Sequence, residues 1–121
     1  MAANNVAAQI SLLDGGNGKV VLWEGMIADS TGDAVTFPDQ ELVSLHGYGT
    51  FDTSGTITIE GKNGGGTYGT LQDGIGGAMT FTAAAVKTTL TPTVSVRPRT
   101  TANGAGGLVD VDVYALFRSL R

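Results

Sequence analysis

The chain has 121 residues, a formal net charge of −4 and a charged fraction of 15%. That fraction is well below the usual ~25%, and the seven basic residues make no cluster, which argues against a nucleic-acid partner. The absence of cysteine excludes disulfides and thiolate metal sites, and the length favours one domain with one core.

The N-terminal residues, MAANNVAAQ, have neither the basic nor the apolar segment of a signal peptide. No apolar run approaches the ~20 residues of a membrane span, so we expect no membrane partner. Residues 1–8 are small and uncharged, and no domain core obviously needs them. We therefore predict an N-terminal arm over 1–8 and a single β-domain over 9–121.

Strand-like runs alternate with glycine-rich turns along the chain, which contains 19 glycines. The runs are rich in Val, Ile, Thr and aromatic residues, and Asp or Asn begins most of the turns between them. In chain order the runs are Val6–Leu13, Lys19–Met26, Leu42–Phe51, Thr56–Lys62, Met79–Thr82, Thr93–Thr101 and Leu108–Phe117. Thr82–Thr89 alone has helical potential, of one or two turns at most. Seven or eight short strands predict an all-β fold, an antiparallel β-sandwich of jelly-roll type.

Alternation within the runs predicts which side chains face the core. In the last run the apolar face contains Val109, Val111, Val113, Ala115 and Phe117, and the opposite face contains Asp110, Asp112 and Tyr114. Ile57 and Ile59 oppose Thr56, Thr58 and Glu60 in the same way, and Val94 and Val96 oppose Ser95 and Arg97. Trp23, in the apolar run VVLWEGM, is expected in the core.

A hairpin between the last two runs would pair charges across its strands. With a turn over TANGAGG, Arg99 faces Asp110 and Arg97 faces Asp112, which predicts a cross-strand charge ladder that selects the register. Pro98 cannot donate to a ladder, so its strand is expected at a sheet edge or at a bulge.

The residues do not form a catalytic, cofactor or metal site. The single histidine, His46, lies in a strand-like run on the face of Leu42 and Tyr48, without the partners of a general base or ligand. Asp110 and Asp112 supply too few oxygens for calcium, and the ladder is the simpler explanation of both. GKNGGGTYG and DGIGG lack the phosphate-binding pattern and are interpreted as hairpin loops. We predict a non-enzymatic protein that needs no cofactor.

The low charge fits either a surface that a partner covers or a surface of Thr, Ser, Asn and Gly that is soluble without much charge. The two ends of the chain suggest an interface with other proteins. The ends combine an uncharged segment with apolar side chains beside arginines, a mixture favoured at interfaces. The candidate interface residues are Ala2, Ala3, Asn4, Asn5, Val6, Leu116, Phe117, Arg118, Leu120 and Arg121. The alternative for the C-terminal end is that it is a core strand whose arginines are solvated. Tyr48, Tyr68 and Tyr114 are dispersed in the sequence, so we interpret them as packing residues and not as a platform that binds sugars.

About half of the chain resembles a known family. The stretch TITIEGKNGGGTYGTLQDGIGGAMTFTAAAVKTTL, then VSVRPRT and a Gly-rich loop into LVDVDVYAL, resembles small glycine-rich β-proteins encoded among the structural genes of tailed bacteriophages. The matching elements are Thr58-Ile59-Glu60-Gly61, Asn63, Thr70-Leu71, Asp73, Phe81-Thr82-Ala83-Ala84, Lys87 and Arg97-Pro98-Arg99. Tyr68 stands where members of that family often have Trp, and the first 55 residues match loosely.

The resemblance implies a virion protein, a capsid decoration or cement protein made in the cytoplasm of the host bacterium. Its partners would be the major capsid protein and further copies of itself, in a trimer on the outer surface of an icosahedral head. A tail or connector component is the first alternative and a carbohydrate-binding β-sandwich module the second. A small enzyme is the most remote possibility.

Overall fold

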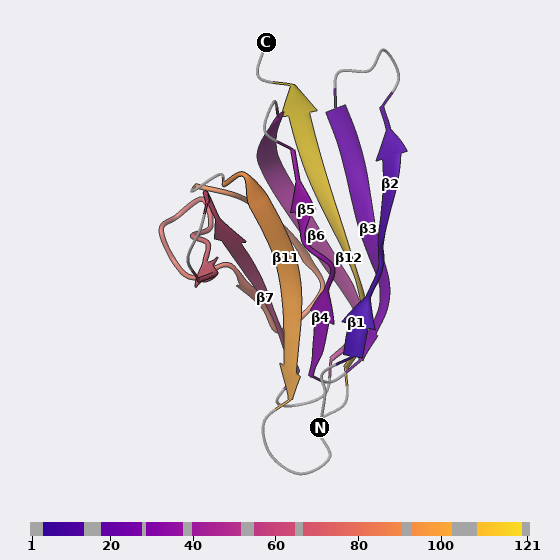
Figure 1. Ribbon diagram of the computed structural model, residues 1–121. Coiled ribbons are helices and arrows are strands. Elements are labelled where there is room, and N and C mark those ends of the chain that lie inside the picture. Colours follow the sequence, from indigo (N-terminus) through magenta and orange to yellow (C-terminus); the bar gives the residue numbers. More distant parts are fainter. Residues whose placement is uncertain are drawn as a thin grey trace.

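The computed structural model describes residues 4–13, 18–27, 29–37, 40–51, 55–64, 67–90, 93–102 and 109–119. These residues form two β-sheets and no helix, and Figure 1 shows the sheets as two layers. Sheet A contains β1 (Asn4–Val6), β4 (Ser30–Gly32), β5 (Val35–Thr36), β7 (Gly55–Lys62), β8 (Gly69–Thr70), β9 (Thr80–Phe81) and β11 (Ser95–Ala102). Sheet B contains β2 (Ala8–Leu12), β3 (Gly18–Ile27), β6 (Gln40–Phe51), β10 (Ala85–Thr88) and β12 (Val109–Ser119).

The two sheets differ in their strand directions. Sheet B has the order β10-β6-β12-β3-β2, and all its neighbours are antiparallel. Sheet A has the order β1-β4-β11-β7-β8, with β5 beside β11 and β9 beside β7. The all-β prediction is confirmed. The β1–β4 pair is parallel, so sheet A is mixed, and the predicted antiparallel pairing holds for its other described strand pairs.

The core lies between the sheets and draws apolar side chains from both. Trp23 is completely buried, as predicted, and its Nε1 donates to the carbonyl oxygen of Asp33 at 2.9 Å. A Cβ at Gly32 would lie 2.6 Å from Trp23 Cδ1 and 2.7 Å from Pro98, so this close approach of the layers requires glycine. The predicted core face of the last run is confirmed where the structure describes it, at Val111, Val113, Ala115 and Phe117.

Two bulges shift the alternation in sheet B. Asp112 lies opposite the additional residue of β3, where Gly25 has a φ of 71° and donates its N–H to Asp112 Oδ1 at 2.9 Å. In β6 the register skips Val43, so Leu42 and Leu45 both point into the core. The predicted shared face of Leu42 and His46 is therefore wrong, because the bulge turns His46 to the outer side.

Every predicted run contains a strand, but the described residues form twelve strands, more than the seven or eight expected. The additional strands β1, β4, β5, β8 and β10 have two to four residues, which is too short to show a period-two pattern. The segment Thr82–Thr89 has no helix: Ala85–Thr88 is β10, paired with β6. The turn 73–77 follows the predicted chemistry, since Asp73 Oδ1 accepts the N–H groups of Ile75 and Gly77.

The predicted last hairpin is wrong. Strand β11 pairs along its whole length with β7 in sheet A, whereas β12 lies between β6 and β3 in sheet B. The arginines and aspartates of the predicted ladder (Arg97, Arg99, Asp110, Asp112) are therefore on different sheets. Alternation fixes which side of a strand faces the core, but it carries no information on which strand lies beside it.

Strand β11 is also not an edge strand, although Pro98 lies within it opposite Ile59. On its other side β11 meets β5 at Ser95 and Val96 and meets β4 at Arg99. Pro98 falls between these two contacts, where a missing N–H removes no ladder hydrogen bond. The proline thus coincides with an interruption of the neighbouring strand.

The predicted N-terminal arm is wrong for the part of it that the structure describes. Asn4–Val6 is β1, paired with β4, and Ala8 is the first residue of β2. Val6 and Ala8 pack against the core. Backbone hydrogen bonds hold this segment in both sheets, although it has too few apolar side chains for the sequence to predict a strand there. Met1–Ala3 lie outside the described residues.

Candidate interaction face

Two rows of directly opposed residues cross all five strands of sheet B on the side away from the core. The first row is Val86, His46, Tyr114, Leu22 and Gln9. The second row is Thr88, Ser44, Leu116, Val20 and Ser11. All ten side chains are exposed or half-buried, and none belongs to Lys, Arg, Asp or Glu. We call these two rows the neutral face.

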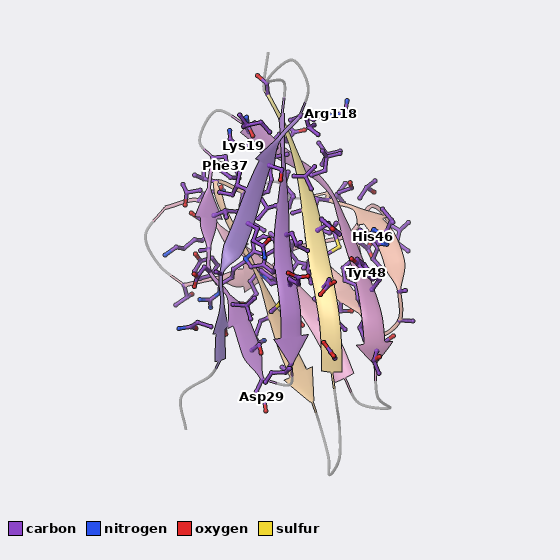
Figure 2. The ribbon with its side chains drawn as sticks, turned by 90° about the vertical axis from the view of Figure 1, so that its right-hand side faces the viewer. Lys19, Asp29, Phe37, His46, Tyr48 and Arg118 are labelled. Carbon is purple, nitrogen blue, oxygen red and sulfur yellow. The ribbon has the colours of Figure 1, made fainter. Side chains whose placement is uncertain are left out.

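Charged groups lie at the two ends of the neutral face. Glu41 and Arg118 oppose each other at one end, and Asp110 and Asp112 lie at the other. Figure 2 shows Arg118 at one end of the strands and His46 near the middle of their length. The result is an uncharged centre with a polar rim, which is the composition of protein interfaces.

An aromatic cluster occupies the β6–β12 part of this side of sheet B. The ring centroids of Tyr48 and Tyr114 are 6.0 Å apart with an interplanar angle of 15°, and His46 lies 5.1 Å from Tyr48. The hydrogen bond with Tyr114, together with desolvation and the neighbouring Asp112 carboxylate, raises the pKa of Tyr48 to about 12. Tyr48 is therefore a neutral hydrogen-bonding group at physiological pH.

The outer side of sheet A is different, because its charges have partners within the chain. Glu60 is only 8% exposed, and its two carboxylate oxygens accept from Arg97 Nε and Arg99 Nε, each at 3.0 Å. The Arg97 guanidinium also lies 3.9 Å from the centre of the Tyr68 ring, with Lys62 Nζ 4.8 Å from the same ring. These contacts make a closed polar cluster that leaves little capacity for a further ligand.

A second apolar exposure lies beside the β10 edge of sheet B. Ile75, at the tip of the turn after Asp73, is 95% exposed, and Val86 is 64% exposed. A depression of about 360 Å³ separates the turn from β10, lined by both of these side chains and by Lys87. Since the Asp73 carboxylate already accepts two N–H groups of the turn, this loop is not arranged to bind an anion.

The predicted interface residues have separate positions in the structure. Leu116 is half-buried on the neutral face and Arg118 is exposed at its end, but Phe117 points into the core, where its ring meets Phe37 edge-on at 4.9 Å. The inclusion of Phe117 was wrong, because successive residues of a strand alternate between the two sides. Asn5 is exposed on β1 and Asn4 belongs to the same strand, whereas Ala2, Ala3, Leu120 and Arg121 lie outside the described residues.

The sequence interpretation missed the contact between the tyrosines. It treated Tyr48 and Tyr114 as dispersed packing residues, but β6 and β12 are neighbours and bring them together on the outer side. The polar alternation of Asp110, Asp112 and Tyr114 already placed Tyr114 outside the core. The position of Tyr48 beside it depended on strand order, which alternation does not predict.

Within the described residues, no group of three or more His, Cys, Asp or Glu side chains is placed to hold a metal ion. None of the described segments is a helix of the length and hydropathy needed to cross a membrane. Comparisons of the chain with protein-family models, curated proteins and solved structures found no match.

Proposed function

We propose that this chain is a non-enzymatic structural protein of a phage virion, which binds the outer surface of an icosahedral head as a decoration or cement protein. The observation that carries the proposal is the neutral face, a side of sheet B with tyrosine and aliphatic side chains and no charge in its two central rows. Charge depletion and tyrosine enrichment are typical of the centre of an interface. The phage setting rests on the resemblance of about half of the sequence to phage structural proteins.

In this proposal the major capsid protein covers the neutral face, and the homo-oligomer presents several such faces to the shell. Each contact needs only modest affinity, because a ligand that binds the assembled shell and not its separated subunits stabilises the shell by mass action. Glu41 and Arg118 at one end, and Asp110 at the other, would lie at the rim and orient the contact. We also propose that the two sheets form a β-sandwich of jelly-roll type.

The direct test mixes purified chain with phage heads that lack it and measures co-sedimentation and the temperature at which the heads release DNA. We expect the chain to sediment with the heads and to raise that temperature. Leu22→Asp places a carboxylate in the centre of the neutral face and should weaken binding by about 100-fold or more, because the charge would be desolvated without a partner.

The matched control is Thr31→Asp on the outer side of sheet A, where the new carboxylate lies opposite Arg99. This variant should bind heads as the unaltered chain does. Failure of the unaltered chain to bind heads would contradict the proposal, as would equal losses for Leu22→Asp and Thr31→Asp. Chain found only in tails would favour the alternative of a tail or connector component.

The Tyr48–Tyr114 pair favours one second candidate, carbohydrate binding. Two half-buried, nearly parallel rings 6.0 Å apart, with the Asp112 carboxylate beside them, combine a stacking surface with hydrogen-bonding groups. Ligand-observed NMR with neutral oligosaccharides such as cellohexaose and mannohexaose tests this candidate. Saturation transfer that disappears in Tyr114→Ala would support a glycan site, and transfer retained in that variant would exclude these rings.

A further inference from the structure

Strand β2 is an outer strand of sheet B without the usual protection of a sheet edge. Within the described residues it pairs only with β3, and Figure 1 shows it at the right-hand margin of the molecule. Its sequence, AQISL, contains no charge and no proline, and its register with β3 has no bulge. Ile10 is 51% exposed and Leu12 is 72% exposed. Natural sheets normally avoid such an edge, because unpaired backbone groups beside apolar side chains invite another strand.

The other outer strands are shorter or covered. β1 has three residues and β8 has two. The edge of β10 is partly covered by the turn that follows Leu71, through a bridge between Asp73 and Thr89 and a hydrogen bond from Leu90 N–H to the carbonyl of Gln72. Among the described outer strands, β2 therefore offers the longest open row of backbone donors and acceptors.

The sequence of β2 is complementary to itself in antiparallel pairing. If two copies pair about Ile10, Ile10 lies opposite Ile10 of the second copy and Ala8 lies opposite Leu12, all on the core-facing side. Gln9 then lies opposite Ser11 on the outer side. In a contact with two-fold symmetry, a charged residue near the axis lies close to the same residue of the second copy and is repelled by it. Strand β2 contains no charged residue, so its pairing with itself involves no such repulsion.

We propose that β2 is a homodimer contact, in which the β2 strands of two copies pair antiparallel and join the two B sheets into one continuous sheet. The contact buries Ile10 and Leu12 and satisfies the open backbone groups of both strands. It closes at two copies, so it predicts a dimer in place of the trimer that the family resemblance implies. It does not depend on capsid binding, since the contact uses the backbone and the core-facing side chains of β2, whereas the neutral face takes only Gln9 and Ser11 from this strand.

The test is sedimentation equilibrium of the purified full chain and of Ile10→Lys. The unaltered chain should be a dimer. Ile10→Lys places two like charges opposite each other and removes two apolar contacts, so it should raise the dimer dissociation constant by roughly 100-fold. Ile27→Lys is the matched control, because Ile27 is 48% exposed on β3 outside this contact, and it should leave the dimer unchanged.

A cross-linking measurement tests the register without a destabilising charge. The chain contains no cysteine, so Ile10→Cys introduces a single thiol that meets its own copy in the proposed dimer. Mild oxidation should convert Ile10→Cys into a disulfide-linked dimer at low protein concentration, and Ile27→Cys should remain unlinked.

Three results would overturn the inference: a monomeric or trimeric unaltered chain, an Ile10→Lys variant that folds and still dimerises, or equal cross-linking of the two cysteine variants. Self-association lost through Ile75→Lys and not through Ile10→Lys would also overturn it, and would place the contact at the β10 depression. None of these measurements involves phage heads, so their failure is distinct from a failure of head binding.

Discussion

The outer sides of the two sheets differ in where their charged side chains lie and in whether these are paired. On sheet A, Glu60 lies between Arg97 and Arg99, and the Tyr68 ring covers one of these arginines. On sheet B, the two central rows carry aromatic, aliphatic and small polar side chains, and the charges lie at the ends. Both sides belong to strands with one buried apolar face, so the difference does not come from the needs of the core.

The polar groups on the outer side of sheet A already have their hydrogen-bond partners within the chain. A carboxylate held by two arginines has its hydrogen-bonding capacity met, and binding a partner there would disrupt those bonds. On the neutral face, Gln9 donates to Glu24 and Tyr114 is hydrogen-bonded to Tyr48, but the aliphatic side chains have no polar groups to lose, and covering them removes apolar surface from water. The outer side of sheet B is therefore the side with few charged groups at its centre, and it is the proposed binding surface.

The largest expected effect comes from giving the neutral face the character of sheet A. His46→Arg combined with Tyr114→Glu places an ion pair at directly opposed positions, where the strand pair itself should remain folded. We expect head binding to fall by about 100-fold or more, while the free energy of unfolding changes by no more than ~1 kcal/mol. Co-sedimentation and urea titration measure the two quantities.

The corresponding control places an ion pair on sheet A, with Thr36→Arg and Ser95→Glu at directly opposed positions. Head binding should not change in this variant. If both double variants lose binding equally, the distinction between the two sides has no functional meaning.

A smaller effect, on stability alone, is expected from Glu60→Gln. The substitution removes the charge that both Arg97 and Arg99 contact in a nearly buried position, and should lower the free energy of unfolding by about 1–2 kcal/mol. Glu41→Gln on sheet B is the matched control: Glu41 is exposed opposite Arg118, and its loss should cost under ~0.5 kcal/mol. Similar losses in urea titrations of the two variants would show that the closed cluster on sheet A adds no stability.

The smallest effect is expected at alkaline pH. Because the pKa of Tyr48 is raised from 10.0 to about 12 in the folded chain, the folded state favours the neutral phenol. This contribution to stability is complete below pH 10 and is lost as the pH rises from about 10 to about 12. Tyr48→Phe should flatten the decline of the melting temperature across that window.

Tyrosinate absorbance supplies a separate check on the cause. Tyr114→Phe removes the hydrogen-bond partner that contributes most to the raised pKa, so the late-titrating phenol should ionise at lower pH in this variant. An unchanged titration curve would mean that desolvation or Asp112, and not Tyr114, holds the proton on Tyr48.

The amino-acid sequence by itself determined the all-β class and the inward or outward direction of most strand residues. Ile57, Ile59, Val96 and Val113 are in the core as alternation predicted, because the period of two is a property of each strand's own backbone. The same reasoning failed at Leu42 and His46, where a bulge adds one residue and changes the side to which the following residues point.

Only the tertiary structure decided which strands are neighbours. Alternation fits β11 beside β12 as well as it fits β11 beside β7, and the arginines of β11 find Glu60 in the second arrangement. The contact of Tyr48 with Tyr114 and the open edge of β2 depend on the same choice. Strand order is set by how two whole sheets close over one core, and this involves contacts between residues far apart in the chain.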